Sequence, residues 1–258
     1  MSMARYFWIF AIYLLFAPAF AAAQITAEDR TAITQCLAQD KSGETCIGIV
    51  FHSCQSRASD PEADKACAGR ELAVWNELLQ ASLKIVNASS PPAVRTAVAE
   101  EQSNWLKSRE SLCPIFNNLD PGMSIGGANY CRLQETSRRA LILQCISVSQ
   151  DKKGQGEACI AVVAGPCKLA KSEGPKACAA RELADSKKSL QATLKDLKVL
   201  LDLSEEQSNW LKSREGLCSL FDIIDPGTYR VGSDDCRLVE TRGHDLILEN
   251  LSEALHEH

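Results

Sequence analysis

Histidine is scarce in this chain of 258 residues, and the sequence motifs of several enzyme classes are absent. Only four histidines occur, and two of them, His256 and His258, lie at the C-terminal end. Neither His52 nor His244 lies beside a serine or cysteine motif of the kind found in nucleophilic enzymes. The sequence contains no glycine-rich phosphate-binding loop and no metal-binding motif. We therefore expect a protein that is not an enzyme and that binds no cofactor and no metal ion.

Basic residues are not in excess, since 28 lysines and arginines stand against 33 aspartates and glutamates for a formal net charge of −5. Domains that bind nucleic acid carry a basic surface, so we expect no nucleic-acid partner. A mildly acidic surface instead favours cationic partners through long-range steering. The adjacent carboxylates Glu100-Glu101 and Glu205-Glu206 point in different directions on a helix. We interpret them as a solvated face rather than as general acid–base pairs.

The apolar run Phe7 to Phe16 is shorter than the roughly 20 residues that a transmembrane helix needs. It follows Arg5, and small residues after it offer cleavage sites. This order is typical of a secretory signal peptide, which we assign to residues 1–23. No cysteine stands at the cleavage point, so the sequence does not predict a lipoprotein anchor. We expect the mature chain to be exported, with no membrane span after signal cleavage.

A stretch of fourteen residues, 100–113, returns as residues 205–218 with a single change, from Ser111 to Gly216. A match this dense at one constant offset indicates an internal duplication. We divide the mature chain into a first repeat, residues 24–144, and a second repeat, residues 145–258. No glycine- or serine-rich linker separates them. We therefore expect the last helix of the first repeat to continue as the first helix of the second.

The apolar spacing in both repeats predicts helices, and the expected fold class is all-α, with two tandem disulfide-bonded helical-bundle repeats. A hydroxyl cap at Thr26, Asp60-Pro61 and Pro91-Pro92 mark helix starts in the first repeat, and Gly174-Pro175 marks one in the second. The β-branched run within residues 46–54 is also compatible with a strand. Because no neighbouring segment offers strands to pair with it, we expect a helix there.

All twelve cysteines follow the predicted signal peptide, six in each repeat. An even set in an exported chain is typical of disulfides, and no Cys-x-x-Cys pair favours zinc. Six cysteines per repeat allow fifteen connectivities. Cys113–Cys131 and Cys218–Cys236 each bracket a loop with an Asp-Pro-Gly sequence, and closing such a loop stabilises by roughly 3 kcal/mol. The other pairs stay open, and we favour Cys54–Cys67, Cys167–Cys178, Cys36–Cys46 and Cys145–Cys159.

Trp105, Arg109 and Cys113 are spaced four residues apart and share one face of the helix that carries the repeated stretch. A tryptophan on the same face as a disulfide cysteine is more often part of the core than of a contact surface. A partly buried guanidinium group needs an acidic partner. We expect Glu71 to pair with Arg109, and Glu182 to pair with Arg214 in the second repeat.

These residues resemble the signature of the exported lysozyme-inhibitor LprI-like domain family, Trp-x-x-x-Arg-Glu-x-x-Cys, a glycine-containing loop and Cys-x-x-x-x-Thr-x-x-Arg. In the first repeat the matching positions are Trp105, Arg109, Glu110, Cys113, Gly126, Gly127, Cys131, Thr136 and Arg139. In the second repeat they are Trp210, Arg214, Glu215, Cys218, Gly232, Cys236 and Thr241. The second repeat departs from the signature at His244, which stands where the family has arginine.

The resemblance implies a small helical, disulfide-bonded domain of the bacterial envelope, in the periplasm or secreted, and lysozyme inhibition is known for some members. Binding residues concentrate on loops held by rigid scaffolds, so we predict partner contacts in the loops at residues 117–129 and 222–235. The partner-binding candidates are Asp120, Tyr130, Asp225, Tyr229 and Arg230.

Two functions of different classes follow from these observations. In the first, the protein inhibits a cationic lysozyme-type hydrolase by covering its cleft with a loop or an acidic face. In the second, it is an envelope structural or adaptor module that bridges protein partners and inhibits no enzyme. Inhibition of a lysozyme by the purified mature protein distinguishes the two.

Overall fold

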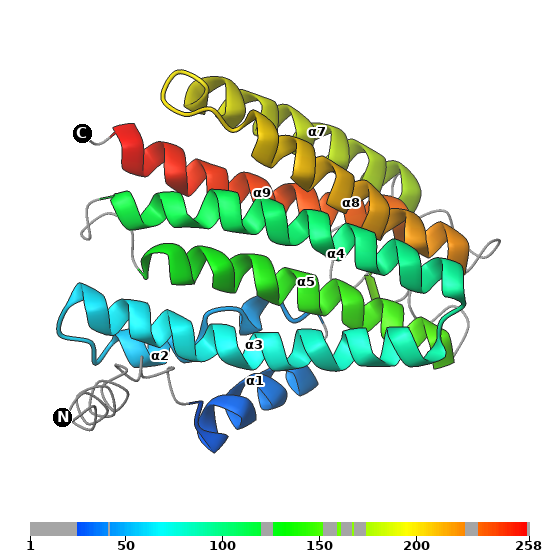
Figure 1. The fold of residues 1–258 in the computed structure, drawn as a ribbon, viewed down its shortest axis with the longest axis horizontal. Helices are drawn as coiled ribbons and strands as arrows, with labels where there is room; N and C mark the ends of the chain where they lie inside the picture. The colour runs from blue at the N-terminus through cyan, green and yellow to red at the C-terminus, as the bar shows by residue number, and fades with distance from the viewer. Residues whose placement is uncertain are drawn as a thin grey trace, which may run out of the picture.

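The computed structural model describes residues 25–40, 42–119, 126–151, 159–160, 167, 174–224 and 232–256. Every regular element in these ranges is a helix, so the all-α prediction is confirmed (Figure 1). The predicted signal peptide, residues 1–23, lies outside the described residues. None of the described helices is both long enough and apolar enough to cross a membrane.

The helices of the first repeat begin where the sequence offers capping groups. Thr26 and Asp29 form a capping box, in which each side chain accepts a hydrogen bond from the other residue's N–H. The Asp60 carboxylate accepts a hydrogen bond of 2.9 Å from the N–H of Ala63. The elements are α1 (Ala27–Gln39), α2 (Ile49–Gln55), α3 (Pro61–Ser89) and α4 (Pro92–Leu112), with the short 3-10 helices η1 (Glu44–Cys46) and η2 (Cys113–Asn118).

The helix expected within residues 46–54 is confirmed by η1 and α2. The next helix, α5 (Gly127–Asp151), runs through the boundary placed between residues 144 and 145. The expected continuation of one helix from the first repeat into the second is thus confirmed. The second repeat also contains α7 (Pro175–Leu197), α8 (Ser204–Ile224) and α9 (Gly232–His256).

The twelve cysteines form six disulfides, with Cα atoms 5.3 to 5.7 Å apart. The pairing agrees with the one favoured from the sequence, including the four pairs that the loop argument left open. These disulfides connect elements that follow one another in the chain, such as α2 with α3. The pairs are Cys36–Cys46, Cys54–Cys67, Cys113–Cys131, Cys145–Cys159, Cys167–Cys178 and Cys218–Cys236.

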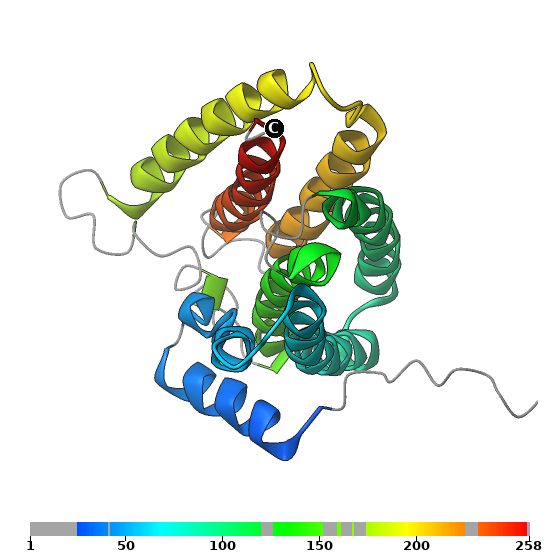
Figure 2. The same cartoon turned by 90° about the vertical axis from the view of Figure 1, so that its left-hand side faces the viewer.

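The two helices that carry the repeated stretch, α4 and α8, pack against each other (Figure 1). Glu101 of α4 contacts Ser213 of α8, and the later residue Ser108 contacts the earlier residue Glu206, so the pair is antiparallel. On either side of this pair, α3 packs against α5 and α7 packs against α9. Figure 2 looks along the bundle and shows α5 in its middle, where it also contacts α9.

The buried cores combine side chains of both repeats. One core contains Trp105 of the first repeat together with Leu217 and Phe221 of the second. Another contains Leu112 of the first repeat together with Trp210 of the second. Because each repeat completes a core of the other, separating them would expose apolar surface that is now buried.

Candidate functional site

The tryptophans of the repeated stretch are buried between the repeats. Trp105 on α4 is 2% exposed and Trp210 on α8 is 1% exposed. The indole N–H of Trp105 donates a hydrogen bond of 3.2 Å to Glu135 on α5. A side chain buried this deeply does not present a contact surface to a partner. The interpretation of these tryptophans as core residues is therefore confirmed.

Arg109 and Arg214 have the same surroundings in the two repeats. The guanidinium of Arg109 lies over the ring of Trp105, 4.6 Å from the ring centroid, and donates to Thr136 Oγ1 at 2.9 Å. Its ion-pair partner is the neighbouring Glu110, at 2.8 Å. Arg214 repeats all three contacts, with Trp210 at 4.7 Å, Thr241 at 3.2 Å and Glu215 at 2.8 Å.

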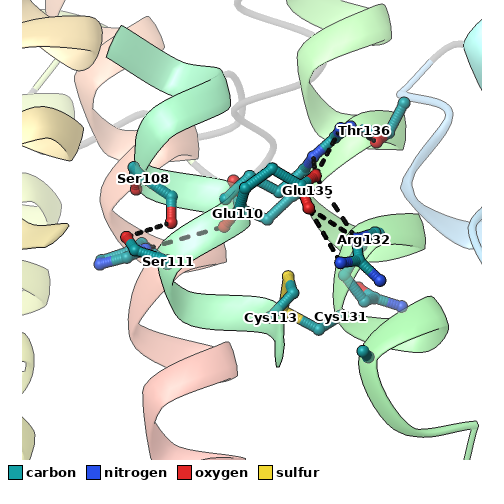
Figure 3. Close-up of a disulfide and its surroundings, with 12 residues drawn as sticks. Ser108, Glu110, Ser111, Cys113, Cys131, Arg132, Glu135 and Thr136 are labelled. Carbon is teal, nitrogen blue, oxygen red and sulfur yellow. Dashed lines mark hydrogen bonds and ion pairs between the residues drawn. A yellow bond between two sulfur atoms is a disulfide. The ribbon is translucent and has the colours of Figure 1, made fainter. Parts of the chain in front are cut away.

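Glu110 extends this arrangement from α4 to α5 (Figure 3). Its carboxylate forms an ion pair of 2.8 Å with Arg132, the residue after Cys131 of the disulfide to Cys113. In the second repeat, Glu215 and Arg237 form the equivalent pair between α8 and α9, at 2.9 Å. The glutamates are nearly half exposed, so these ion pairs contribute less to stability than the disulfides beside them.

The prediction that Glu71 pairs with Arg109 is wrong, because Glu71 holds the start of α2. Its buried carboxylate accepts hydrogen bonds of 2.6 to 2.9 Å from the N–H groups of Gly48, Val50 and Phe51. An anion at this place satisfies donors that the first turn of a helix leaves unpaired. The Trp75 indole adds a fourth hydrogen bond of 2.9 Å.

The prediction that Glu182 pairs with Arg214 is also wrong. Glu182 forms ion pairs with Arg181 and with Arg242 on α9. Both errors have the same physical origin. The spacing of residues along a helix determines which of them share a face, but it does not determine which neighbouring helix that face meets.

The interpretation of Glu101 and Glu206 as part of a solvated face is wrong as well. Glu101 is 2% exposed and Glu206 is 3% exposed, whereas the preceding glutamates are exposed. Glu206 accepts a hydrogen bond of 2.6 Å from Ser108, and Glu101 accepts one of 3.4 Å from Ser213. Two carboxylates therefore lie in the contact between the repeats, where a buried charge requires a positive partner.

Arg139 and His244 supply the positive charge beside these carboxylates. Arg139 forms an ion pair with Glu101, and His244 lies 3.7 Å from Glu206. The two residues occupy equivalent positions in the repeats, and both are fully buried. The difference between arginine and histidine at these equivalent positions thus falls in the buried contact between the repeats.

Tyr130 is the one partner-binding candidate within the described residues. The other four, Asp120, Asp225, Tyr229 and Arg230, lie outside them. The Tyr130 ring, in the first turn of α5, lies 4.7 Å from the ring of Phe51 and 6.5 Å from that of the exposed His52. Burial raises the pKa of Tyr130 above its ordinary value of 10.0, so its hydroxyl is neutral at physiological pH.

The end of the first repeat at which Tyr130 lies is firmly held. Asn129 donates a hydrogen bond of 3.0 Å to the carbonyl oxygen of Lys65, which joins the start of α5 to the start of α3. The disulfides Cys54–Cys67 and Cys113–Cys131 attach these helix starts to α2 and η2. Acidic side chains lie at the start of α3. We call the group of His52, Asp60, Glu62 and Tyr130 the Tyr130 surface.

The second repeat has a different residue at the place of Tyr130. Counting from the following cysteine, the equivalent position is Asp235, in the first turn of α9. Asp235 is 3% exposed, and burial together with the charge of Asp234 raises its pKa to about 6. The two repeats therefore share their buried motif but do not share the surface next to it.

The fold and the site define an all-helical, disulfide-bonded protein. Its described histidine, cysteine, aspartate and glutamate residues form no group that could hold a metal ion. Residues 54–143, about a third of the chain, match the family model described as Lysozyme inhibitor LprI. The match runs from the end of α2 through α3 and α4 into α5, so this part of the chain is similar to that family. A search of curated proteins and a search of solved structures each found no match.

Proposed function

We propose that this protein is exported and inhibits a cationic lysozyme-type hydrolase, which it binds through the Tyr130 surface of the first repeat. The observation that carries this proposal is the match of residues 54–143 to the Lysozyme inhibitor LprI family. The matched segment contains Tyr130, Asp60 and Glu62. The six disulfides support export, because disulfides persist in oxidising compartments outside the cytoplasm.

The Tyr130 surface has the physical properties that such binding requires. Tyrosine is enriched at the energetic centres of protein interfaces. Two disulfides hold the surface rigid, which lowers the entropy lost on binding. The exposed Asp60 attracts a cationic enzyme and accelerates the encounter, whereas Glu62 is paired with Lys65 at 2.8 Å. The inhibitor needs no chemistry of its own in this mechanism, since it acts by excluding the substrate from the cleft.

The first test measures the activity of a cationic lysozyme against increasing concentrations of the mature protein, residues 24–258. We expect inhibition, and we expect Tyr130→Ala to raise the concentration for half-inhibition about tenfold or more, the loss typical of a truncated central aromatic. The matched control is Leu211→Ala. Leu211 is 43% exposed on α8 and lies outside the matched segment, so this variant should inhibit as well as the natural sequence.

Two outcomes would count against the proposal. No inhibition at micromolar excess would reject the inhibitor function and favour the adaptor module, whose binding partner a pull-down from envelope extract would then recover. Equal potency of the Tyr130→Ala and Leu211→Ala variants would keep the inhibitor function but move the contact away from the Tyr130 surface.

A further inference from the structure

The contact between α4 and α8 has a local two-fold arrangement. Residues of the two repeats correspond at an offset of 105, as residue 100 to residue 205. Ser108 donates a hydrogen bond to Glu206, and their equivalents exchange roles across the contact, because Ser213 donates to Glu101. Each repeat therefore presents the same serine and glutamate to the other, as in an isologous interface between identical subunits.

The same reciprocal pattern holds for the charged side chains beside these serine–glutamate contacts. Arg139 forms an ion pair with Glu101 of its own repeat and lies 3.8 Å from Glu240 of the other. His244 lies 3.7 Å from Glu206 of its own repeat and 3.7 Å from Glu135 of the other. Glu135 and Glu240 are themselves equivalent positions, so the two halves pair equivalent residues.

Six ionisable side chains thus meet between α4, α5, α8 and α9, and none is more than 8% exposed. At the edge of this group, Arg138 of α5 donates a hydrogen bond of 3.3 Å to the carbonyl oxygen of Gly243. Four carboxylates face one arginine and one histidine where water does not screen them. We call the six residues the central cluster: Glu101, Glu135, Arg139, Glu206, Glu240 and His244.

The two cations of the central cluster respond differently to pH. Burial lowers the pKa of Arg139 to about 10, although Glu240 opposes this, so Arg139 stays charged through the neutral range. Histidine ordinarily titrates near pH 6.5. His244 stacks on Trp210, with ring centroids 4.3 Å apart and planes 11° apart, as Arg139 lies over Trp105 at 5.5 Å. The half of the central cluster that contains Arg139 therefore keeps its positive charge through the neutral range, whereas the half that contains His244 has a titratable charge.

The surroundings of His244 favour its protonated form. Burial by itself lowers the pKa of His244, but the charges of Glu206, Glu135 and Glu240 outweigh burial and raise this pKa above 6.5. The side-chain amide of Gln207 lies 2.8 Å from His244 Nε2. Because an amide offers both an N–H donor and a carbonyl acceptor, Gln207 can bond the neutral or the charged ring.

The carboxylates around His244 depend on its charge. Burial raises the pKa of Glu206 above 4.5, and the charge of His244 opposes this rise. Burial raises the pKa of Glu240 in the same way, opposed by Arg139 and His244. For Glu135, burial is outweighed by the interaction with His244, 3.7 Å away, and its pKa falls below 4.5. Removing the proton from His244 therefore affects three carboxylates at once.

We propose that the contact between α4 and α8 is a pH-sensitive joint between the repeats, which protonated His244 holds closed and which loosens when His244 loses its proton. Neutral His244 leaves four buried carboxylates facing Arg139, with Arg138 at the edge of the cluster as the next cation. Such a group must either take up protons or admit water. Water reaches the central cluster most directly if α4 and α8 separate, because these helices carry Glu101 and Glu206.

The direction of the pH dependence follows from the pKa shifts. A raised pKa of His244 contributes stability that is present below pH 6.5 and is lost as the pH rises through the folded-state value. The raised pKa values of Glu206 and Glu240 act in the same direction at lower pH. The lowered pKa of Glu135 acts in the opposite direction, since its contribution is lost in acid. The joint should be most stable in mild acid and weaken above pH 6.5.

The test compares thermal unfolding of the mature protein with that of the His244→Arg variant, followed by circular dichroism from pH 5.5 to about 9. In the natural sequence we expect Tm to fall above pH 6.5, by about 3 to 5 °C for each pKa unit by which folding raises the pKa of His244. His244→Arg makes the two halves of the cluster alike, and its Tm should vary much less over this range. Equal profiles for the two proteins would overturn the proposal.

Two further variants keep the test decisive if His244→Arg does not fold. Glu206→Gln removes a carboxylate that raises the pKa of His244, so the fall in Tm above pH 6.5 should be smaller and should end at a lower pH. His256→Gln is the matched control, because His256 also lies on α9 but its side chain is 52% exposed. This control should keep the natural profile. A Glu206→Gln variant whose Tm falls as far above pH 6.5 as that of the control would reject the role of His244.

A second measurement separates a joint from a general loss of stability. Hydrogen exchange of backbone amides, corrected for the intrinsic rate at each pH, should show protection falling on α4 and α8 above pH 6.5 while α3 keeps its protection. An equal loss on α3 would mean that His244 stabilises the whole chain and would overturn the joint. A proton resonance of His244 that titrates at or below pH 6.5 would overturn it as well.

Discussion

At the scale of single residues, Glu71 shows how one buried carboxylate can set a helix start. It is fully buried, and it accepts hydrogen bonds from the N–H groups of Gly48, Val50 and Phe51. These groups include the first donors of α2, which lacks a side-chain cap of its own. Since α2 supports the Phe51 ring beside Tyr130, Glu71 indirectly positions the Tyr130 surface.

Replacing Glu71 with alanine should therefore destabilise the protein by about 3 kcal/mol, because several buried donors lose their acceptor. Urea unfolding followed by circular dichroism measures the change in the free energy of unfolding. Glu77→Ala is the control on the same helix, since Glu77 is exposed and pairs with Arg30 at the surface. This variant should unfold nearly as the natural sequence does, and a Glu71→Ala variant of equal stability would contradict the capping role.

At the scale of elements, α4 and α8 carry almost the same sequence yet do not make identical contacts. A Cβ atom added at Gly216 of α8 would lie 2.9 Å from the Cβ of Glu101 on α4. The equivalent Ser111 is exposed. The single difference between the two stretches thus falls at a point of close contact between the two helices. A similar relation holds at Gly243, which leaves space for the side chain of its own equivalent, Arg138.

The Gly216→Ser variant tests this approach, because it makes the two repeated stretches identical. Serine is a better helix former than glycine, so an open position would gain stability. Here we expect a loss of about 1 to 3 kcal/mol from overpacking against Glu101. The reverse change, Ser111→Gly, should cost only the difference in helix propensity, below about 1 kcal/mol. Thermal melts of both variants measure these changes in stability. A Gly216→Ser variant more stable than the natural sequence would refute the close contact.

At the scale of the whole molecule, three structural features connect the two repeats. They share α5, they share two apolar cores, and they share the central cluster. Each of these links buries surface or charge that a single repeat would expose. The repeats are therefore distinct in sequence but not independent in structure.

We expect a fragment of residues 24–144 to lack a cooperative thermal transition, because its α4 would expose Trp105 and leave Glu101 and Arg139 in water-accessible positions. Adding a fragment of residues 145–258 should restore part of the transition seen with the intact mature chain. Near-ultraviolet circular dichroism of the tryptophans reports on both. A sharp transition of the first fragment alone would show that one repeat suffices for a fold.

Much of the fold could be predicted from local sequence. Helix starts at Thr26, Asp60 and Pro92 follow from capping groups and prolines that act on their own neighbours. Cys113–Cys131 and Cys218–Cys236 also follow from the loops that they bracket, whereas the other four pairs stayed open until the structure showed them. The family resemblance in the first repeat rests on the same kind of short-range pattern, and the match of residues 54–143 agrees with it.

The central cluster could not be predicted in this way. Glu101 and Arg139 lie on different helices, and Glu206 and His244 lie on two more. Nothing in the spacing of any one helix indicates that these four meet. The one available signal was the exchange of arginine for histidine at equivalent positions of an otherwise well-matched motif. Its meaning depends on the neighbours of both side chains, which the sequence does not specify.

The sequence by itself determined the helices, the duplication and the two disulfides that close the Asp-Pro-Gly loops, because capping, periodicity and loop closure act over short distances along the chain. Only the tertiary structure decided that the duplicated helices bury their glutamates against each other instead of exposing them. It also decided that Glu71 caps a helix rather than pairing with Arg109. Those outcomes depend on which helix faces which, and that choice is made by packing between residues that are distant in the chain.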